Sequence, residues 1–103
     1  MEQFKVLLLN QSNKVLGIYE ASSGGITGTV VDIRLLFAAA LKSNATGLIV
    51  SHNHPSGRTE PSEPDRYITR KIAQAGMLLD IKLMDHLIIT SESYYSFADQ
   101  GAL

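Results

Sequence analysis

The stretch LIVSHNHPSG, residues 48–57, decides how the chain is expected to fold. Residues 48–50 form a continuous apolar run, which is typical of a central strand covered on both faces. The run gives way to polar residues at its end, where His52 is the last predicted strand residue. Side chains two positions apart in a strand share a face, with their Cα atoms about 6–7 Å apart. His52 and His54 are therefore expected to converge, with Asn53 pointing away.

Short strands are predicted before and after this segment. Residues 4–9 and 15–19 are rich in apolar and β-favouring residues, and the turn-forming residues 10–13 between them predict a hairpin. Three glycines then predict a bend or bulge before the chain leaves the sheet: Gly24, Gly25 and Gly28. Residues 81–90 and 94–97 are predicted as two further strands.

Helical periodicity appears twice. From Asp32, whose side chain suits an N-cap, one apolar face is predicted for a first helix, made of Ile33, Leu36, Phe37, Ala40 and Leu41. A second helix is predicted from about residue 63 to 75, ending at Gly76. Its inward side chains are expected to be Ile68, Ile72 and Ala75.

The order of these elements, β-β-α-β-α-β-β, predicts an α/β fold. We expect a three-layer α/β/α domain with a central mixed β-sheet. The chain has 103 residues, which is enough for one hydrophobic core and too few for two, so residues 1–103 are predicted to form a single domain.

Charge and composition give no support to several kinds of partner and limit the kind of metal site. Nine Lys and Arg stand against ten Asp and Glu, and this balance provides no bulk field that would attract nucleic acid or an acidic membrane. The chain has no cysteine, so any metal must be bound by nitrogen and oxygen ligands. The lack of cysteine also suits the reducing cytoplasm, where we expect the protein. The apolar stretches are far shorter than the roughly 20 residues of a membrane-spanning helix.

Two histidines at a strand end and a nearby carboxylate suggest a metal site. Zinc accepts imidazole nitrogen and carboxylate oxygen, and a catalytic site keeps three protein ligands with one open position. Asp65, in the first turn of the second helix, is the candidate third ligand beside His52 and His54. Ser62, three residues earlier, also fits a capping box at the start of that helix, and both roles can coexist.

The motif His52-x-His54-Pro55, with Ser62 and Asp65 eight and eleven positions after His54, resembles the metal-binding motif of the JAMM (MPN-type) metalloproteases. Over nearly its whole length the chain resembles the RadC family in particular, through HNHPSG at 52–57, EPSEPD at 60–65, Asp85-His86 and Ser96-Phe97. The resemblance implies a JAMM/MPN-like architecture, which is similar to that of cytidine deaminases. It also implies that the N-terminal helical region of full-length family members is absent here.

The resemblance implies a role for each motif residue. His52, His54 and Asp65 would bind Zn²⁺, Ser62 would steady the reacting centre, and an upstream glutamate would activate a water. That glutamate is expected to be Glu2, which opens the first strand. Glu20 is the alternative, because no fixed spacing to the histidines decides between them. The implied reaction is hydrolysis of an amide or isopeptide bond in a peptide or protein substrate.

Several alternatives stay open at the level of the sequence. His86 is interpreted either as a core residue with a hydrogen bond or as a neighbour of the metal ligands, and it is left out of the ligand set. The RadC family is associated with DNA repair, although no basic stripe or nucleic-acid motif is seen in this chain. Three hypotheses result: a zinc-dependent peptidase or isopeptidase, a DNA-associated factor, and a catalytically silent metal-binding module.

Overall fold

The computed structural model describes residues 2–23 and 31–103, which form the predicted order of elements. The expected glycine bend at residues 24–28 lies outside the described residues. The strands are β1 (Gln3–Leu9), β2 (Val15–Ser23), β3 (Gly47–Asn53), β4 (Lys82–Ile89) and β5 (Tyr94–Ser96), and the helices are α1 (Ile33–Lys42) and α2 (Glu63–Leu79). The α/β class is confirmed.

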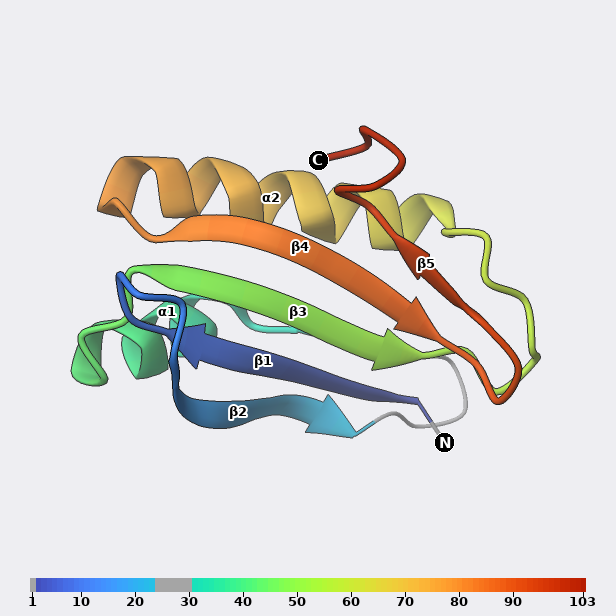
Figure 1. Ribbon diagram of the computed structural model, residues 1–103, viewed down its shortest axis with the longest axis horizontal. Helices are drawn as coiled ribbons and strands as arrows, with labels where there is room; N and C mark the ends of the chain where they lie inside the picture. Colours follow the sequence, from blue (N-terminus) through green and yellow to red (C-terminus); the bar gives the residue numbers. More distant parts are fainter. Residues whose placement is uncertain (1, 24–30) are drawn as a thin grey trace.

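The five strands form one mixed sheet in the order β2-β1-β3-β4-β5 (Figure 1). β1 is antiparallel to both of its neighbours, β3 is parallel to β4, and β5 pairs antiparallel with β4. β3 is therefore the central strand, as its apolar run predicted.

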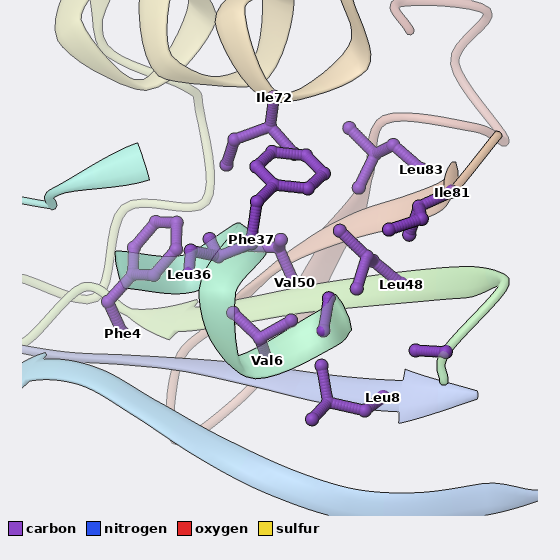
Figure 2. Close-up of a cluster of buried hydrophobic side chains, with 12 residues drawn as sticks. Phe4, Val6, Leu8, Leu36, Phe37, Leu48, Val50, Ile72, Ile81 and Leu83 are labelled. Atoms are coloured by element: carbon purple, nitrogen blue, oxygen red, sulfur yellow. The ribbon is translucent and has the colours of Figure 1, made fainter. Parts of the chain in front are cut away.

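Both described helices pack on the same face of this sheet. One cluster of buried side chains unites Leu36 and Phe37 of α1 with Ile72 of α2 and the inward residues of β1 and β3 (Figure 2). The reason is the topology of the sheet. The connection from β2 to β3 and the connection from β3 to β4 each join two parallel strands, and both cross the sheet in the same direction. Right-handed crossovers of that kind place their helices on one side.

The predicted three-layer arrangement is therefore corrected to two layers among the described residues. The expectation that β3 is covered on both faces is wrong for the same reason, because Ile49 between Leu48 and Val50 is only partly buried. On the uncovered face of β2, Ile18 is 66% exposed.

The first helix begins as predicted and ends with one difference. The side chain of Asp32 accepts a hydrogen bond from the backbone N–H of Arg34, which confirms the N-cap. Leu36, Phe37 and Ala40 are buried, but Leu41 in the last turn is half exposed. Ala45, which follows the helix, is buried in the core cluster instead.

The second helix is longer than predicted, because Gly76 lies inside it rather than ending it. The helix continues to Leu79 and ends at Asp80, which adopts the left-handed conformation at φ 57°. A Cβ atom at position 76 would lie only 2.1 Å from the carbonyl oxygen of Ile81. Glycine is thus required here by a close approach of the backbone and not by a helix stop.

The C-terminal segment is tied to β4 by Asp85. Its carboxylate accepts hydrogen bonds from the Ser96 hydroxyl at 2.6 Å and from the Ala98 backbone N–H at 2.9 Å. These bonds hold Phe97 in a fully buried position, where its ring stacks on that of His86 at 4.6 Å. Among the described residues, no helix has the length and apolarity needed to cross a membrane.

Candidate metal centre

Three elements meet at one edge of the sheet, where β1 begins, β3 ends and α2 begins (Figure 1). In the antiparallel register of β1 and β3, Phe4 pairs with His52. Two residues further along each strand, in opposite directions, are Glu2 and His54, so the register carries both toward the same place. His54 lies just beyond β3, and its backbone N–H still donates to the Ile89 carbonyl at 3.0 Å.

Asp65 is held at the start of α2 by a capping box. The Ser62 side chain accepts from the Asp65 backbone N–H at 3.1 Å, and the Asp65 carboxylate accepts from the Ser62 backbone N–H at 2.8 Å. These two bonds fix the carboxylate on the side of the helix that faces the histidines. Ser62 and Asp65 thus form the capping box while the Asp65 carboxylate also faces the two histidines.

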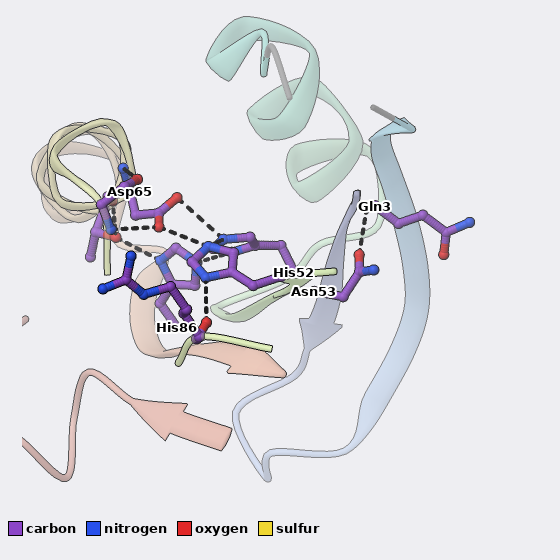
Figure 3. A network of polar contacts seen from close by, with 9 residues as sticks. Gln3, His52, Asn53, Asp65 and His86 are labelled. Atoms are coloured by element: carbon purple, nitrogen blue, oxygen red, sulfur yellow. Dashed lines mark hydrogen bonds and ion pairs between the residues drawn. The ribbon is translucent and has the colours of Figure 1, made fainter. Parts of the chain in front are cut away.

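The two histidines and Asp65 converge as the sequence predicted. The Nε2 atoms of His52 and His54 lie 3.0 Å apart, and the Asp65 oxygens lie 3.2 Å from His52 Nε2 and 3.1 Å from His54 Nε2 (Figure 3). All three side chains are largely buried. Around a tetrahedral ion with ligands at about 2.0 Å, neighbouring ligand atoms are about 3.3 Å apart. The observed spacing fits that arrangement.

The charges at this point call for a cation. Burial raises the pKa of the Asp65 carboxyl, but the neighbouring His52 ring and the hydrogen bonds of Ser62 outweigh that effect and hold the pKa well below its usual value. The Nδ1 atom of His54 lies 2.8 Å from the Arg58 carbonyl oxygen, which can only accept. The neutral ring therefore carries its proton on Nδ1, and its Nε2 lone pair faces a carboxylate. Two acceptors at that distance repel each other unless a proton or a metal cation lies between them.

Glu2 approaches the same two histidines from β1. One potential ligand atom from each of Glu2, His52 and His54 falls within 4.8 Å of the others, close enough to hold a metal ion. Glu20 does not belong to this group: it pairs with Lys5 in the hairpin. The register of β1 against β3 therefore favours Glu2 over Glu20 as the glutamate of the site.

Comparison with known proteins agrees with this geometry. A model of the family described as the RadC-like JAB domain matches residues 1–102. The chain belongs to the RadC-like JAB domain family. Among its relatives, a UPF0758 protein of Flavobacterium johnsoniae is 57% identical over 97% of this chain and 44% of its own length. The UPF0758 protein YfjY of Escherichia coli K12 is 43% identical over 99% of this chain and 64% of its own length.

A third relative, a UPF0758 protein of Porphyromonas gingivalis, is 45% identical over 99% of this chain and 45% of its own length. The chain thus spans less than two thirds of the length of these relatives. None of the three names states an activity.

In this RadC-like JAB domain, His86 and Thr69 lie behind the histidines of the site. Neither residue belonged to the site residues predicted from the sequence. His86 Nε2 lies 2.8 Å from His52 Nδ1, and Thr69 Oγ1 lies 2.6 Å from His86 Nδ1. Burial lowers the pKa of His86 to about 3, and the neighbouring His52 acts in the same direction. Thr69 had a readable signal, because it follows Asp65 by four residues, which is one helical turn. For His86 the sequence left open a core residue or a neighbour of the metal ligands, and the pairing of β3 with β4 shows that it is buried and lies beside His52.

The surroundings of the site are also organised. Asn53 points away from His52 and His54 as predicted, and its side-chain oxygen accepts from the Gln3 backbone N–H at 2.6 Å (Figure 3). This bond holds the start of β1, and hence Glu2, beside the end of β3. A cavity of about 290 Å³ opens next to the histidines, and its lining consists of His54, Ser56, Arg58, Glu60, Pro61 and Ser62.

Proposed function

We propose that this RadC-like JAB domain is a zinc-dependent hydrolase that cleaves an amide bond in a peptide or an isopeptide-linked protein. His52, His54 and Asp65 would hold the ion, and Glu2 would act as the general base. One observation carries the proposal: Nε2 of His52, Nε2 of His54 and the Asp65 carboxylate face one another at 3.0–3.2 Å. A carboxylate next to the histidines, that of Glu2, completes the set that hydrolysis needs.

The donor set favours zinc over the hard cations. Two imidazole nitrogens and one carboxylate suit Zn²⁺, whereas Mg²⁺ and Ca²⁺ prefer sites made of oxygen atoms. Asp65 is a better third ligand than Glu2, because its oxygens lie within 3.2 Å of the histidine nitrogens and the capping box fixes them. Zinc in such a site supplies Lewis acidity, which polarises a carbonyl group and lowers the pKa of water.

Glu2 is the group placed to move protons. It stays outside the proposed ligand set and is partly exposed. It lies just before the first residue of β1, beside both histidines. Its carboxylate would take a proton from the attacking water and return it to the nitrogen of the leaving amine. The bond from Gln3 to Asn53 would keep that carboxylate in reach through both transfers.

Ser62 would donate a hydrogen bond to the carbonyl oxygen of the substrate. Its Oγ already accepts from the Asp65 backbone N–H, but its own hydroxyl proton is not needed for the capping box. Ser62 and His54 line the same cavity, where a carbonyl group would have access to both. In other enzymes, loss of one such donor costs about 3–4 kcal/mol of transition-state stabilisation.

The setting of the reaction is part of the same proposal. A site built from imidazole and carboxylate, in a chain without cysteine, is suited to a reducing cytoplasm, and that is where we place it. The DNA-associated and catalytically silent hypotheses gain no support from a described contact, and they serve as alternative outcomes of the test.

The test combines metal content with amide hydrolysis in four proteins. The wild type, Glu2→Gln, Glu20→Gln and Asp65→Ala are purified without chelator, analysed for zinc, and assayed on peptide and lysine-isopeptide libraries. We expect one zinc per chain in the first three and little in Asp65→Ala. Hydrolysis should fall by about 10²–10⁴-fold in Glu2→Gln, as loss of a general base requires, and stay unchanged in Glu20→Gln.

Three results would contradict the proposal in different ways. A wild type without zinc removes the basis for hydrolysis, and unchanged zinc in Asp65→Ala places the ion elsewhere. Stoichiometric zinc without turnover of any amide favours the silent module. Tight binding to oligonucleotides that weakens steeply with salt favours the DNA-associated factor instead.

A further inference from the structure

His86 is a histidine that the proposed reaction does not use, and it is fully buried. Its ring stacks on Phe97 at 4.6 Å and meets Phe4 edge-on at 5.8 Å, so aromatic packing fixes the plane of the imidazole. Both ring nitrogens have partners: His52 Nδ1 at 2.8 Å on one side and Thr69 Oγ1 at 2.6 Å on the other. In a neutral histidine only one ring nitrogen carries a proton. The hydrogen bond that His86 makes with the Thr69 hydroxyl therefore determines whether its other nitrogen donates to His52 or accepts from it.

The direction of each hydrogen bond follows from counting protons, beginning at Thr69. Its hydroxyl has one proton, which it donates to the Asp65 backbone carbonyl at 2.7 Å. The same oxygen can therefore only accept from His86, so His86 carries its proton on Nδ1. The neutral His86 ring then has a bare Nε2, which must accept from Nδ1 of His52. His52 is thereby left with a lone pair on Nε2.

We propose that Thr69 and His86 are positioning residues that set the tautomer of His52, so that Nε2 is free to bind the metal. This inference rests on the proposed metal-binding role of His52. The tautomers of the two histidines are then set by different groups. The Arg58 backbone carbonyl sets that of His54, and the Thr69–His86 pair sets that of His52.

The same bonds connect the third ligand to this arrangement. Thr69 donates to the carbonyl of Asp65 itself, one turn earlier on α2. The hydroxyl group therefore links the helix that carries Asp65 to the strand that carries His86, and through it to the strand of His52. Partners of this kind in other metal proteins typically change metal affinity by about 10–100-fold when removed.

The tautomer can be measured directly on the metal-free chain. Long-range ¹H–¹⁵N NMR at neutral pH distinguishes a protonated from a bare nitrogen in each of the three rings. We expect a proton on Nδ1 and none on Nε2 in His52, His54 and His86. In Thr69→Val, which keeps the shape of the side chain but lacks the hydroxyl, His52 should lose this single tautomer.

Zinc affinity is the second measurement, made by competition with a chromophoric chelator. We expect binding about 10-fold weaker in Thr69→Val and up to about 100-fold weaker in His86→Phe. Thr69→Ser, which restores the hydroxyl, should recover both affinity and tautomer. Ile72→Val is the matched control: it trims a buried side chain one turn away on the same helix without touching the site, and both readouts should stay unchanged.

The inference is overturned if wild-type His52 carries its proton on Nε2. It is equally overturned if Thr69→Val and Ile72→Val change zinc affinity alike, since the effect would then be a general loss of packing. Because the tautomer is measured on the metal-free chain, its result does not depend on whether the protein is a zinc hydrolase. The positioning role and the hydrolase can therefore be contradicted independently. An inactive chain whose His52 is protonated on Nδ1 would contradict the hydrolase and still support the positioning role.

Discussion

At the scale of single residues, the site is defined by which atoms lack a proton. His54 Nδ1 faces a carbonyl that only accepts, and the Asp65 carboxylate accepts from the backbone N–H of Ser62. In the proposed arrangement, lone pairs of His52, His54 and Asp65 face a common point in the absence of an ion. Preorganisation of this kind reduces the cost of assembling the site on binding.

Ser62 allows the capping role and the chemical role to be separated. Ser62→Ala should lower the free energy of unfolding by about 1 kcal/mol, because an N-cap of α2 is lost. Ser62→Asn keeps a good N-cap, so its stability should stay within about 0.5 kcal/mol of the wild type. Urea denaturation measures both. Ser62→Ala also removes the only side-chain donor at this position and should lose amide hydrolysis, so a fully active Ser62→Ala would argue against the donor role.

At the scale of elements, α2 connects the site to the core over its whole length. Its first turn carries Asp65, its middle carries Thr69 and Ile72, and near its end Gly76 lets the chain return to β4. The N–H of Ile81 donates to the Gly76 carbonyl at 2.8 Å, which holds the backbone against the helix. The position of Asp65 at the start of the helix therefore depends on packing at its far end.

Gly76→Ala should destabilise the protein although alanine favours helices. The intrinsic gain of about 1 kcal/mol is opposed by a Cβ placed 2.1 Å from the Ile81 carbonyl oxygen, which the backbone must move to accommodate. We expect a net loss of about 1–3 kcal/mol in chemical denaturation. Gly17→Ala is the matched control, since no atom lies within 4 Å of its added Cβ. Equal stability of the two variants would show that the close approach is relieved at little cost.

At the scale of the whole molecule, the described residues form a sheet with both helices on one face, and the site lies where β1 and α2 begin and β3 ends. A metal ion held there by His52, His54 and Asp65 would connect the end of β3 to the start of α2 across the loop between them. An ion that binds only the folded chain stabilises it by mass action. Metal binding and global stability should therefore be coupled.

Zinc at about 100 times its dissociation constant should stabilise the chain by about 2.7 kcal/mol. For a domain of this size, that corresponds to a rise in Tm of roughly 10–20 °C. Calorimetry with and without chelator measures the shift. Magnesium at the same concentration should have no effect, and His54→Ala should show little response to zinc. An equal shift in His54→Ala would mean that the stabilising ion binds somewhere else.

Local patterns in the sequence determined the order of elements and three of the site residues. His52 and His54 are two apart at a strand end, and Asp65 stands at a helix start, so strand alternation and capping chemistry were enough to bring them together. The length of α2 was misjudged because a glycine in a sequence signals a helix stop and a close backbone approach equally well.

Only the tertiary structure decided the rest, because it depends on pairings between distant segments. The register of β1 against β3 places Glu2, and not Glu20, beside the histidines. The pairing of β3 with β4 brings His86 behind His52, and the shared direction of two crossovers puts both helices on one face. Strand register and crossover handedness are properties of the assembled sheet, and no local periodicity encodes them.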